Sequence, residues 1–197
     1  MDATTKAIWR KFHVKQRDTV PFSGWWTSNR QTVDELLAEL GFNYGAEVGV
    51  CKGQHARVLL RLNKNLNMIL IDPWCSYGRL SQEKAELRYA MCLKNLAPYE
   101  DRIKYMKMYS MEAVKEIKDG SLDFVYIDGL HEFDPVMMDI ISWTPKVRQG
   151  GIIAGHDYYA FYQSGIIDAV NTYTRAHNIN EWYITRDKEA TWFWVQK

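Results

Sequence analysis

From Tyr44 onward, short apolar runs alternate with longer stretches whose apolar residues recur at helical spacing. Short apolar runs predict buried strands, and the longer periodic stretches predict helices. Five strands are expected, with the sequences YGAEVGV, NMILID, RIKYMKM, LDFVYID and GIIAGH. The helices between them are expected at 53–64, 81–97, 110–118 and 134–147. Strands that are apolar throughout and alternate with helices predict a parallel sheet covered on both faces.

The end of the chain has a different pattern. A helix expected at 164–177 is followed by EWYITR, the polar stretch DKEA and TWFWVQ. Two β-rich runs around a short polar turn predict an antiparallel hairpin. The expected fold class is therefore α/β, with a seven-stranded, mostly parallel sheet, an antiparallel C-terminal hairpin and helices on both faces.

Residues 1–43 lie outside the strand–helix repeat and are expected to extend a single domain at 44–197. VPFSGWWTSNRQ predicts a loop, and TVDELLAEL predicts a short amphipathic helix that ends at Gly41. Trp25 and Trp26 fall in the loop. They either form a lid over a ligand pocket or anchor the segment, and the pattern leaves both open.

The composition is typical of a soluble intracellular domain. With 197 residues, 47% of them hydrophobic, the chain can form a full core. Lys and Arg total 25 against 24 Asp and Glu, so the basic footprint of a nucleic-acid binder is missing. Three cysteines without CxxC spacing favour a reducing cytoplasm. We see neither a signal peptide nor the roughly 20 apolar residues that span a bilayer, so no membrane partner is expected.

Ligands of open parallel sheets bind beyond the carboxyl ends of the strands. The loop after the first strand, AEVGVCKGQHA, contains Glu47, Gly49 and Gly53. Glycines let a ligand approach the backbone, and the next helix presents free N–H groups to an anion. Alternatively, these glycines only form a tight turn. The loop differs from the dinucleotide pattern G-x-G-x-x-G, because Cys51 stands in place of its second glycine.

Asp72 ends the second predicted strand, 23 residues beyond Gly49. An acid there can accept hydrogen bonds from both ribose hydroxyls of a nucleoside. The structural alternative is that Asp72 opens the turn before Pro73. The glycine-containing loop and Asp72 follow consecutive predicted strands in register. Together they favour a nucleoside site.

With these motifs the chain resembles the class I S-adenosylmethionine-dependent methyltransferases. Within that class it is most similar to the small branch of catechol and macrolide-sugar O-methyltransferases. The resemblance runs from about Tyr44 to the C-terminus and is carried by AEVGVCKG, LIDPW, LDFVYIDG, RQGGIIAGHDY and the terminal hairpin. It implies a Rossmann-like fold and S-adenosylmethionine as the cofactor.

The resemblance also implies roles for individual residues. Loop 47–53 would hold the methionine part of the cofactor, Asp72 its ribose, and the pair after the third strand its adenine. Asp128 would lie at the sulfonium end, where the cofactor meets the acceptor. The residues expected to bind the cofactor are Glu47, Gly49, Val50, Gly53, Asp72, Tyr109, Ser110, Asp128 and Gly129.

Methyl transfer from sulfonium is an in-line displacement, and a hydroxyl acceptor must also lose its proton to a base or at a metal. The candidates for this chemistry, in the loops after the fourth and fifth strands, are Asp128, His131, Glu132, His156 and Asp157. Of these, the expected catalytic residues are Asp128, His131, His156 and Asp157. Asp128, His156 and Asp157 occupy the positions that hold Mg²⁺ in metal-dependent relatives, although magnesium prefers oxygen ligands. Alternatively, His156 is a general base that Asp157 orients.

Both histidines also have structural interpretations. His156 can be a strand-end residue bonded to backbone. His131 can belong to a turn in DGLHEFDP, in which Asp134 caps a helix that starts at Pro135.

The expected function is transfer of a methyl group to a hydroxyl of a small molecule that resembles a sugar or a phenol. Two rival functions are an NAD(P)-dependent oxidoreductase with the same sheet and a methyltransferase-like domain that only binds ligands. The sequence leaves open the acceptor's identity and whether protomers pair as a homodimer.

Overall fold

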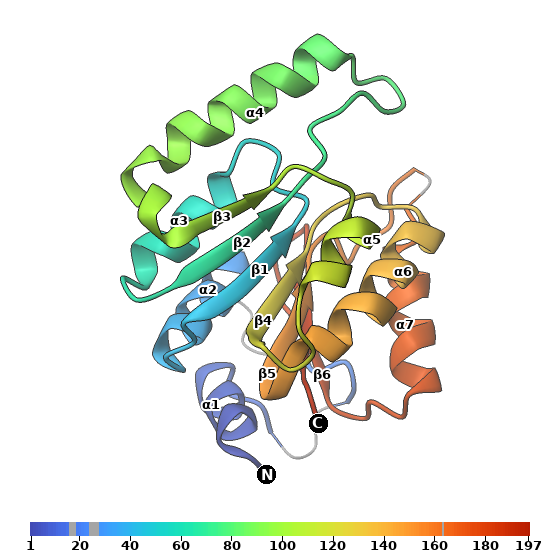
Figure 1. The fold of residues 1–197 in the computed structure, drawn as a ribbon. Coiled ribbons are helices and arrows are strands. Elements are labelled where there is room, and N and C mark those ends of the chain that lie inside the picture. The colour runs from blue at the N-terminus through green and yellow to red at the C-terminus, as the bar shows by residue number, and fades with distance from the viewer. Residues whose placement is uncertain (16–18, 24–27, 163) are drawn as a thin grey trace.

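The computed structural model describes residues 1–15, 19–23, 28–162 and 164–197, so Trp25 and Trp26 lie outside the described residues. Seven strands form one sheet in the order β3-β2-β1-β4-β5-β7-β6 (Figure 1). They are Tyr44–Val48 (β1), Asn67–Ile71 (β2), Ile103–Met106 (β3), Leu122–Ile127 (β4), Val147–Gly155 (β5), Trp182–Ile184 (β6) and Trp192–Val195 (β7). Strands β1 to β5 pair in parallel, whereas β7 is antiparallel to both its neighbours. The predicted fold class is confirmed.

Helices cover both faces of the sheet (Figure 1). One face carries Ala3–Lys11 (α1), Arg30–Glu39 (α2), Gln54–Leu62 (α3) and Gln82–Leu96 (α4); the other carries Ser110–Ala113 (α5), Phe133–Trp143 (α6) and Ile166–Ala176 (α7). Phe124 and Tyr126 of β4 pack in the first core, and Val125 and Ile127 in the second. Successive side chains of a strand point to opposite faces, so β4 supports both cores. None of the helices in the described ranges is long and apolar enough to cross a membrane.

The N-terminal segment contains two helices where the sequence predicted one. Asp2 caps α1, because its side chain accepts a hydrogen bond from the Thr5 amide at 2.8 Å. The second helix, α2, starts at Arg30 rather than Thr32, because Asn29 and Thr32 form a capping box around its first turn. Whether residues 1–43 are an extension separable from the rest stays a prediction.

Two other expected boundaries were wrong. Helix α6 begins at Phe133, and Glu132 takes the extended backbone conformation of an N-cap. Asp134 therefore lies inside the helix and does not cap it. Strand β5 begins at Val147, earlier than the apolar run GIIAGH indicated.

A buried ionic chain joins α2 and α3 to β1. The Nε2 atom of His55 lies 3.0 Å from Asp34 Oδ1, and its Nδ1 atom lies 3.4 Å from Glu47 Oε1. Burial opposes a charge on His55, but Glu47 and Asp34 outweigh it and raise the pKa of His55 to about 10. Burial also raises the pKa of Glu47, against the attraction of His55. The side chains of Asp34, His55 and Glu47 thus form an imidazolium held between two carboxyl groups.

The position of Phe12 predicts that α1 belongs to the cooperative core. Phe12 is 1% exposed, and its ring centroid lies 5.3 Å from that of Phe193 in β7. We expect Phe12→Ala to lower the free energy of unfolding by about 3–5 kcal/mol in urea titrations, because it leaves a cavity. Arg10→Ala, on the exposed side of α1, should change it by less than about 0.5 kcal/mol. Equal effects of the two substitutions would contradict this role for α1.

The ionic chain predicts that stability falls at alkaline pH. The pKa of His55 is raised in the folded state from 6.5 to about 10. Its contribution is therefore complete below pH 6.5 and is lost progressively as the pH rises to about 10. The difference in unfolding free energy between wild type and His55→Gln should shrink over this range, by at most about 1.4 kcal/mol per pH unit. A difference that stays constant with pH would show that His55 is not charged.

Candidate functional site

A cavity of about 310 Å³ lies beyond the carboxyl ends of β1, β2 and β4. The sheet order reverses at this place, because β2 and β3 follow on one side of β1 and β4 and β5 on the other. Most of its lining side chains are apolar. The lining residues are Val48, Gly49, Cys51, Ile71, Asp72, Pro73, Trp74, Cys75, Tyr77, Leu80, Ala85, Arg88, Tyr109, Ser110, Met111, Asp128, Gly129, Leu130, Pro135, Met138 and Asp139.

Gly49 sets the shape of the cavity floor. Its φ is +90°, and a Cβ atom there would lie 2.0 Å from the carbonyl oxygen of Asp128. Only glycine allows the backbones at the ends of β1 and β4 to come this close. The amide of Asp128 also donates to the carbonyl of Val48 at 2.7 Å, which keeps the two strand ends together.

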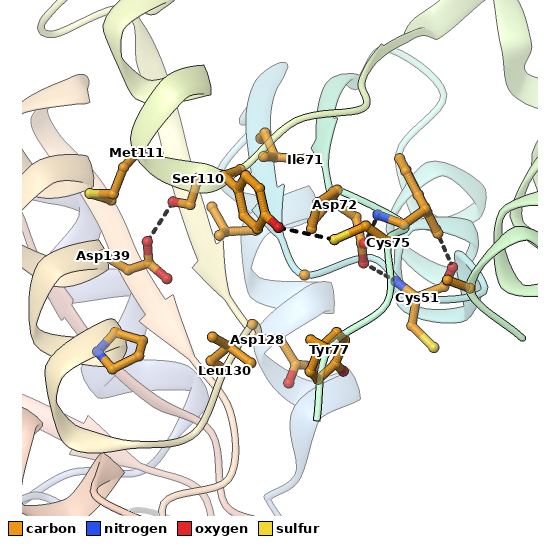
Figure 2. Close-up of a pocket in the computed structure, with 18 of the residues that line it drawn as sticks. Cys51, Ile71, Asp72, Cys75, Tyr77, Ser110, Met111, Asp128, Leu130 and Asp139 are labelled. Carbon is orange, nitrogen blue, oxygen red and sulfur yellow. Dashed lines mark hydrogen bonds between the residues drawn. The ribbon is translucent and has the colours of Figure 1, made fainter. Parts of the chain in front are cut away.

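Asp72 shapes the first loop and faces the cavity (Figure 2). Its Oδ2 atom accepts hydrogen bonds from the amides of Val50 and Cys51 at 3.1 and 2.9 Å, and its Oδ1 atom accepts one from Trp74 at 2.8 Å. Each carboxylate oxygen has two lone pairs, so Oδ1 can accept one further hydrogen bond. This capacity fits the predicted contact with a ribose hydroxyl.

Three predicted cofactor-binding residues do not line the cavity. Glu47 is 1% exposed, and its side chain faces His55 of α3. Val50 is buried, and Gly53 is the N-cap of α3 with a φ of +71°. The direct contacts with the cofactor that the resemblance implies for these three residues stay predictions.

Tyr109, Ser110 and Gly129 do line the cavity, on the sides of β3 and β4. The phenol oxygen of Tyr109 lies 3.2 Å from Cys75 Sγ, and Cys75 also lines the cavity. Gly129 follows Asp128 at the end of β4. Asp72, which follows the second strand, and Tyr109 and Ser110, which follow the third, therefore line the same cavity.

The four predicted catalytic residues form one cluster with Arg30. Asp128 Oδ2 lies 3.4 Å from Arg30 Nη2, and Asp128 Oδ1 lies 4.0 Å from His131 Nε2. Asp157 Oδ2 and Oδ1 each lie 3.1 Å from a histidine, His131 and His156 respectively. Asp157 has a φ of +59°, so the chain leaves the strand there and its carboxylate can turn back to His156.

The charges of this cluster alternate. The interactions with Asp128 and Asp157 raise the pKa of His131 to about 9, so His131 is a cation at neutral pH. Burial would raise the pKa of Asp157, but His131 and His156 outweigh it and hold that pKa well below its usual range. A second, small depression of about 10 Å³ is lined by His131 and His156 and shares Asp128 with the main cavity.

The cluster fits magnesium poorly. Asp128, His131 and Asp157 bring ligand atoms within 4.8 Å of one another, as do His156, Asp157 and Glu189. However, both oxygens of Asp157 already face histidines, and Asp128 already faces a guanidinium. Magnesium takes several oxygen ligands in octahedral geometry, and this donor set offers mainly paired carboxylates and imidazoles.

Two charged residues of the site, Arg30 and Asp139, are not predicted by the sequence, because neither follows a strand. Arg30 starts α2, in the segment predicted to be an N-terminal extension. Asp139 lies in the middle of α6, buried, with its carboxylate on the cavity wall. An acid on the otherwise apolar face of a helix was the available signal for Asp139; Arg30 had none.

A family model described as a methyltransferase domain matches residues 46–158. An uncharacterised protein of Acanthamoeba polyphaga mimivirus is 29% identical over 133 residues, which are 64% of this chain and 56% of that protein. The chain thus spans about half the length of that relative.

Solved structures show the same fold. A candidate caffeoyl-CoA O-methyltransferase from Staphylococcus aureus aligns with a TM-score of 0.65 at 11% identity, over 100% of this chain and 93% of that one. An O-methyltransferase from Bacillus cereus, in complex with SAH, aligns with a TM-score of 0.62 at 14% identity, over 100% and 92%. The family model covers more than half of the chain. The chain therefore belongs to the methyltransferase-domain family and has the class I S-adenosylmethionine-dependent methyltransferase fold.

Proposed function

We propose that the protein is an S-adenosylmethionine-dependent methyltransferase that methylates a hydroxyl group of a small molecule. The observation that carries this proposal is the cavity at the strand ends, where Gly49, Asp72 and Asp128 meet in a chain of the methyltransferase family. The related Bacillus cereus structure contains SAH, the demethylated cofactor, which supports the same ligand here.

The cavity favours a cationic nucleoside. Among the described residues, three carboxylates, from Asp72, Asp128 and Asp139, line it against one cation, Arg88, and most of the other lining side chains are apolar. Asp72 can hold the ribose, and Asp128 lies where the acceptor side begins. When bound, the cofactor supplies an electrophilic methyl group on a sulfonium. The enzyme then has to align that methyl group with the acceptor oxygen.

The acceptor belongs beside the histidines. Arg30 and His131 are each paired with Asp128, so an anionic acceptor would have to displace Asp128 from both. A neutral hydroxyl compound needs no such exchange. The rings of His131 and Phe161 at the same edge are in edge-to-face contact, with their centroids 5.5 Å apart. Such aromatic side chains suit an acceptor that contains a ring.

His156 is the proposed general base. Its Nδ1 atom faces Asp157 at 3.1 Å, which favours the tautomer with the proton on Nδ1 and the lone pair on Nε2. The imidazole lines the small depression beside Asp128. His131, already protonated, orients Asp157 and cannot act as a base at neutral pH. A cytoplasmic location is part of the proposal, and all three cysteines are free thiols.

The proposed ribose contact predicts the effect of Asp72→Ala on cofactor binding. Isothermal titration with SAH should show a loss of about 1–3 kcal/mol, because the substitution removes a hydrogen-bond acceptor. Asp101→Ala, which changes an exposed acid outside the cavity, should leave the affinity unchanged. Unchanged SAH affinity in Asp72→Ala would remove Asp72 from the site. Binding of NADH by the wild type, with none of SAH, would favour an oxidoreductase.

The ion-paired cluster predicts methyl transfer without a metal. SAH release over a panel of sugar and phenol acceptors should be unaffected by EDTA. His156→Asn should lower kcat by about 100-fold or more, since it removes the base. His177→Asn, at the end of α7 and outside both cavities, serves as the matched control. Activity lost in EDTA and restored by Mg²⁺ would instead show that a metal assists the reaction.

A further inference from the structure

Asp139 is a buried acid that the strand-end roles above do not use. It is 6% exposed, lies in the middle of α6, and lines the main cavity. A carboxylate loses hydration when it is buried, and that loss is offset only where hydrogen-bond donors reach it. The contacts of Asp139 therefore indicate which kind of ligand group completes its environment.

One oxygen of Asp139 is held by a chain of directed hydrogen bonds. The indole Nε1–H of Trp143 donates to Ser110 Oγ at 2.7 Å. Ser110 Oγ lies 2.5 Å from Asp139 Oδ1. An indole N–H can only donate and a serine hydroxyl has a single hydrogen, so Ser110 must donate that hydrogen to Oδ1.

The other oxygen of Asp139 remains available on the cavity side. No residue in the described ranges donates a hydrogen bond to Oδ2, and a Cβ atom placed on Gly129 would lie 3.7 Å from it. Burial raises the pKa of Asp139 to about 6, against the hydrogen bond from Ser110. At neutral pH the group is mainly a carboxylate, so Oδ2 can accept a hydrogen bond but cannot donate one.

The surroundings of Oδ2 suit a flat heterocycle. Figure 2 shows Ser110, Met111 and Asp139 on one side of the cavity and Asp72 and Cys51 on the other. The part of the lining that comes from α5 and α6 is otherwise apolar, with Met111, Pro135 and Met138, and it contains no Lys or Arg. The amino-acid end of a cofactor would bring its own carboxylate next to Asp139. A purine brings an apolar face and an N–H at its edge.

We propose that Asp139, positioned by Ser110, accepts a hydrogen bond from the exocyclic amino group of the cofactor's adenine and thereby selects a 6-amino over a 6-oxo purine. This inference rests on the proposed function. In this arrangement Asp139 binds the adenine at one end of the cavity, and Asp72 binds the ribose nearer the other end. A 6-oxo purine would place a carbonyl oxygen against the carboxylate, and two acceptors cannot pair.

The test compares SAH with its 6-oxo analogue, S-inosylhomocysteine, by isothermal titration. Wild type should bind SAH about 10- to 100-fold more tightly, which corresponds to one hydrogen bond to a charged group. In Asp139→Asn, the Ser110 hydroxyl should hold the amide oxygen and turn the amide nitrogen toward the cavity. That nitrogen can donate to the 6-oxo group, so the preference for SAH should fall by about tenfold or more.

Asp134→Asn is the matched control, because Asp134 is an exposed acid on the same helix and does not line the cavity. It should keep the wild-type preference. A preference in Asp139→Asn that falls by less than about threefold overturns the inference, and so does a wild type that binds both ligands equally. The wild-type comparison needs no variant, so a failure of Asp139→Asn to fold leaves the test intact. Absence of SAH binding to the wild type would instead overturn the proposed function.

Discussion

The backbone contact between Gly49 and Asp128 is the constraint on which the site depends. At a switch point, the connections that follow two neighbouring parallel strands lead to helices on opposite faces of the sheet. A crevice therefore opens beyond the ends of these strands. A Cβ atom at position 49 would collide with the Asp128 carbonyl, and the two strand ends would have to separate. The hydrogen bonds that Asp72 accepts from the amides of Val50 and Cys51 then fix the loop that Gly49 begins. The cavity floor is thus set by backbone geometry more than by side chains.

Helix α2 contributes charged side chains to two ionic groups of the structure, the one at His55 and the one at Asp128. Asp34 faces the buried His55 beneath β1, and Arg30, four residues earlier on the same helix, faces Asp128 at the cavity rim. The ring of Tyr126 lies near both groups: its centroid is 5.8 Å from the guanidinium of Arg30 and 4.2 Å from the ring centroid of His55. A shift of α2 would therefore disturb both at once. The segment before β1 contributes to the site's electrostatics even though the family model begins at residue 46.

The parts of the site that follow strands were predictable from the sequence. Apolar runs identify where strands end, and Gly49, Asp72 and Asp128 all line the cavity at those ends. Glu47 was expected to contact the cofactor, but Ala46 and Val48 pack against α5–α7, so the side chain between them faces the opposite layer, toward His55. Arg30 and Asp139 were different, since helix residues reach the cavity only through tertiary packing. Local patterns cannot show which turn of α2 or α6 meets a strand end.

The carboxylates that line the cavity can strengthen cofactor binding in the proposed reaction, but they cannot accelerate the methyl transfer. Asp72, Asp128 and Asp139 favour a cationic sulfonium, but that positive charge disappears as the methyl group leaves sulfur. Groups that bind the charged ground state more strongly than the transition state do not accelerate the step. Rate enhancement must therefore come from the acceptor side, where the proposed base His156, oriented by Asp157, can take up a proton as the oxygen attacks. In this proposal the cavity carboxylates serve affinity and alignment, and His156 beside them removes the proton of the acceptor.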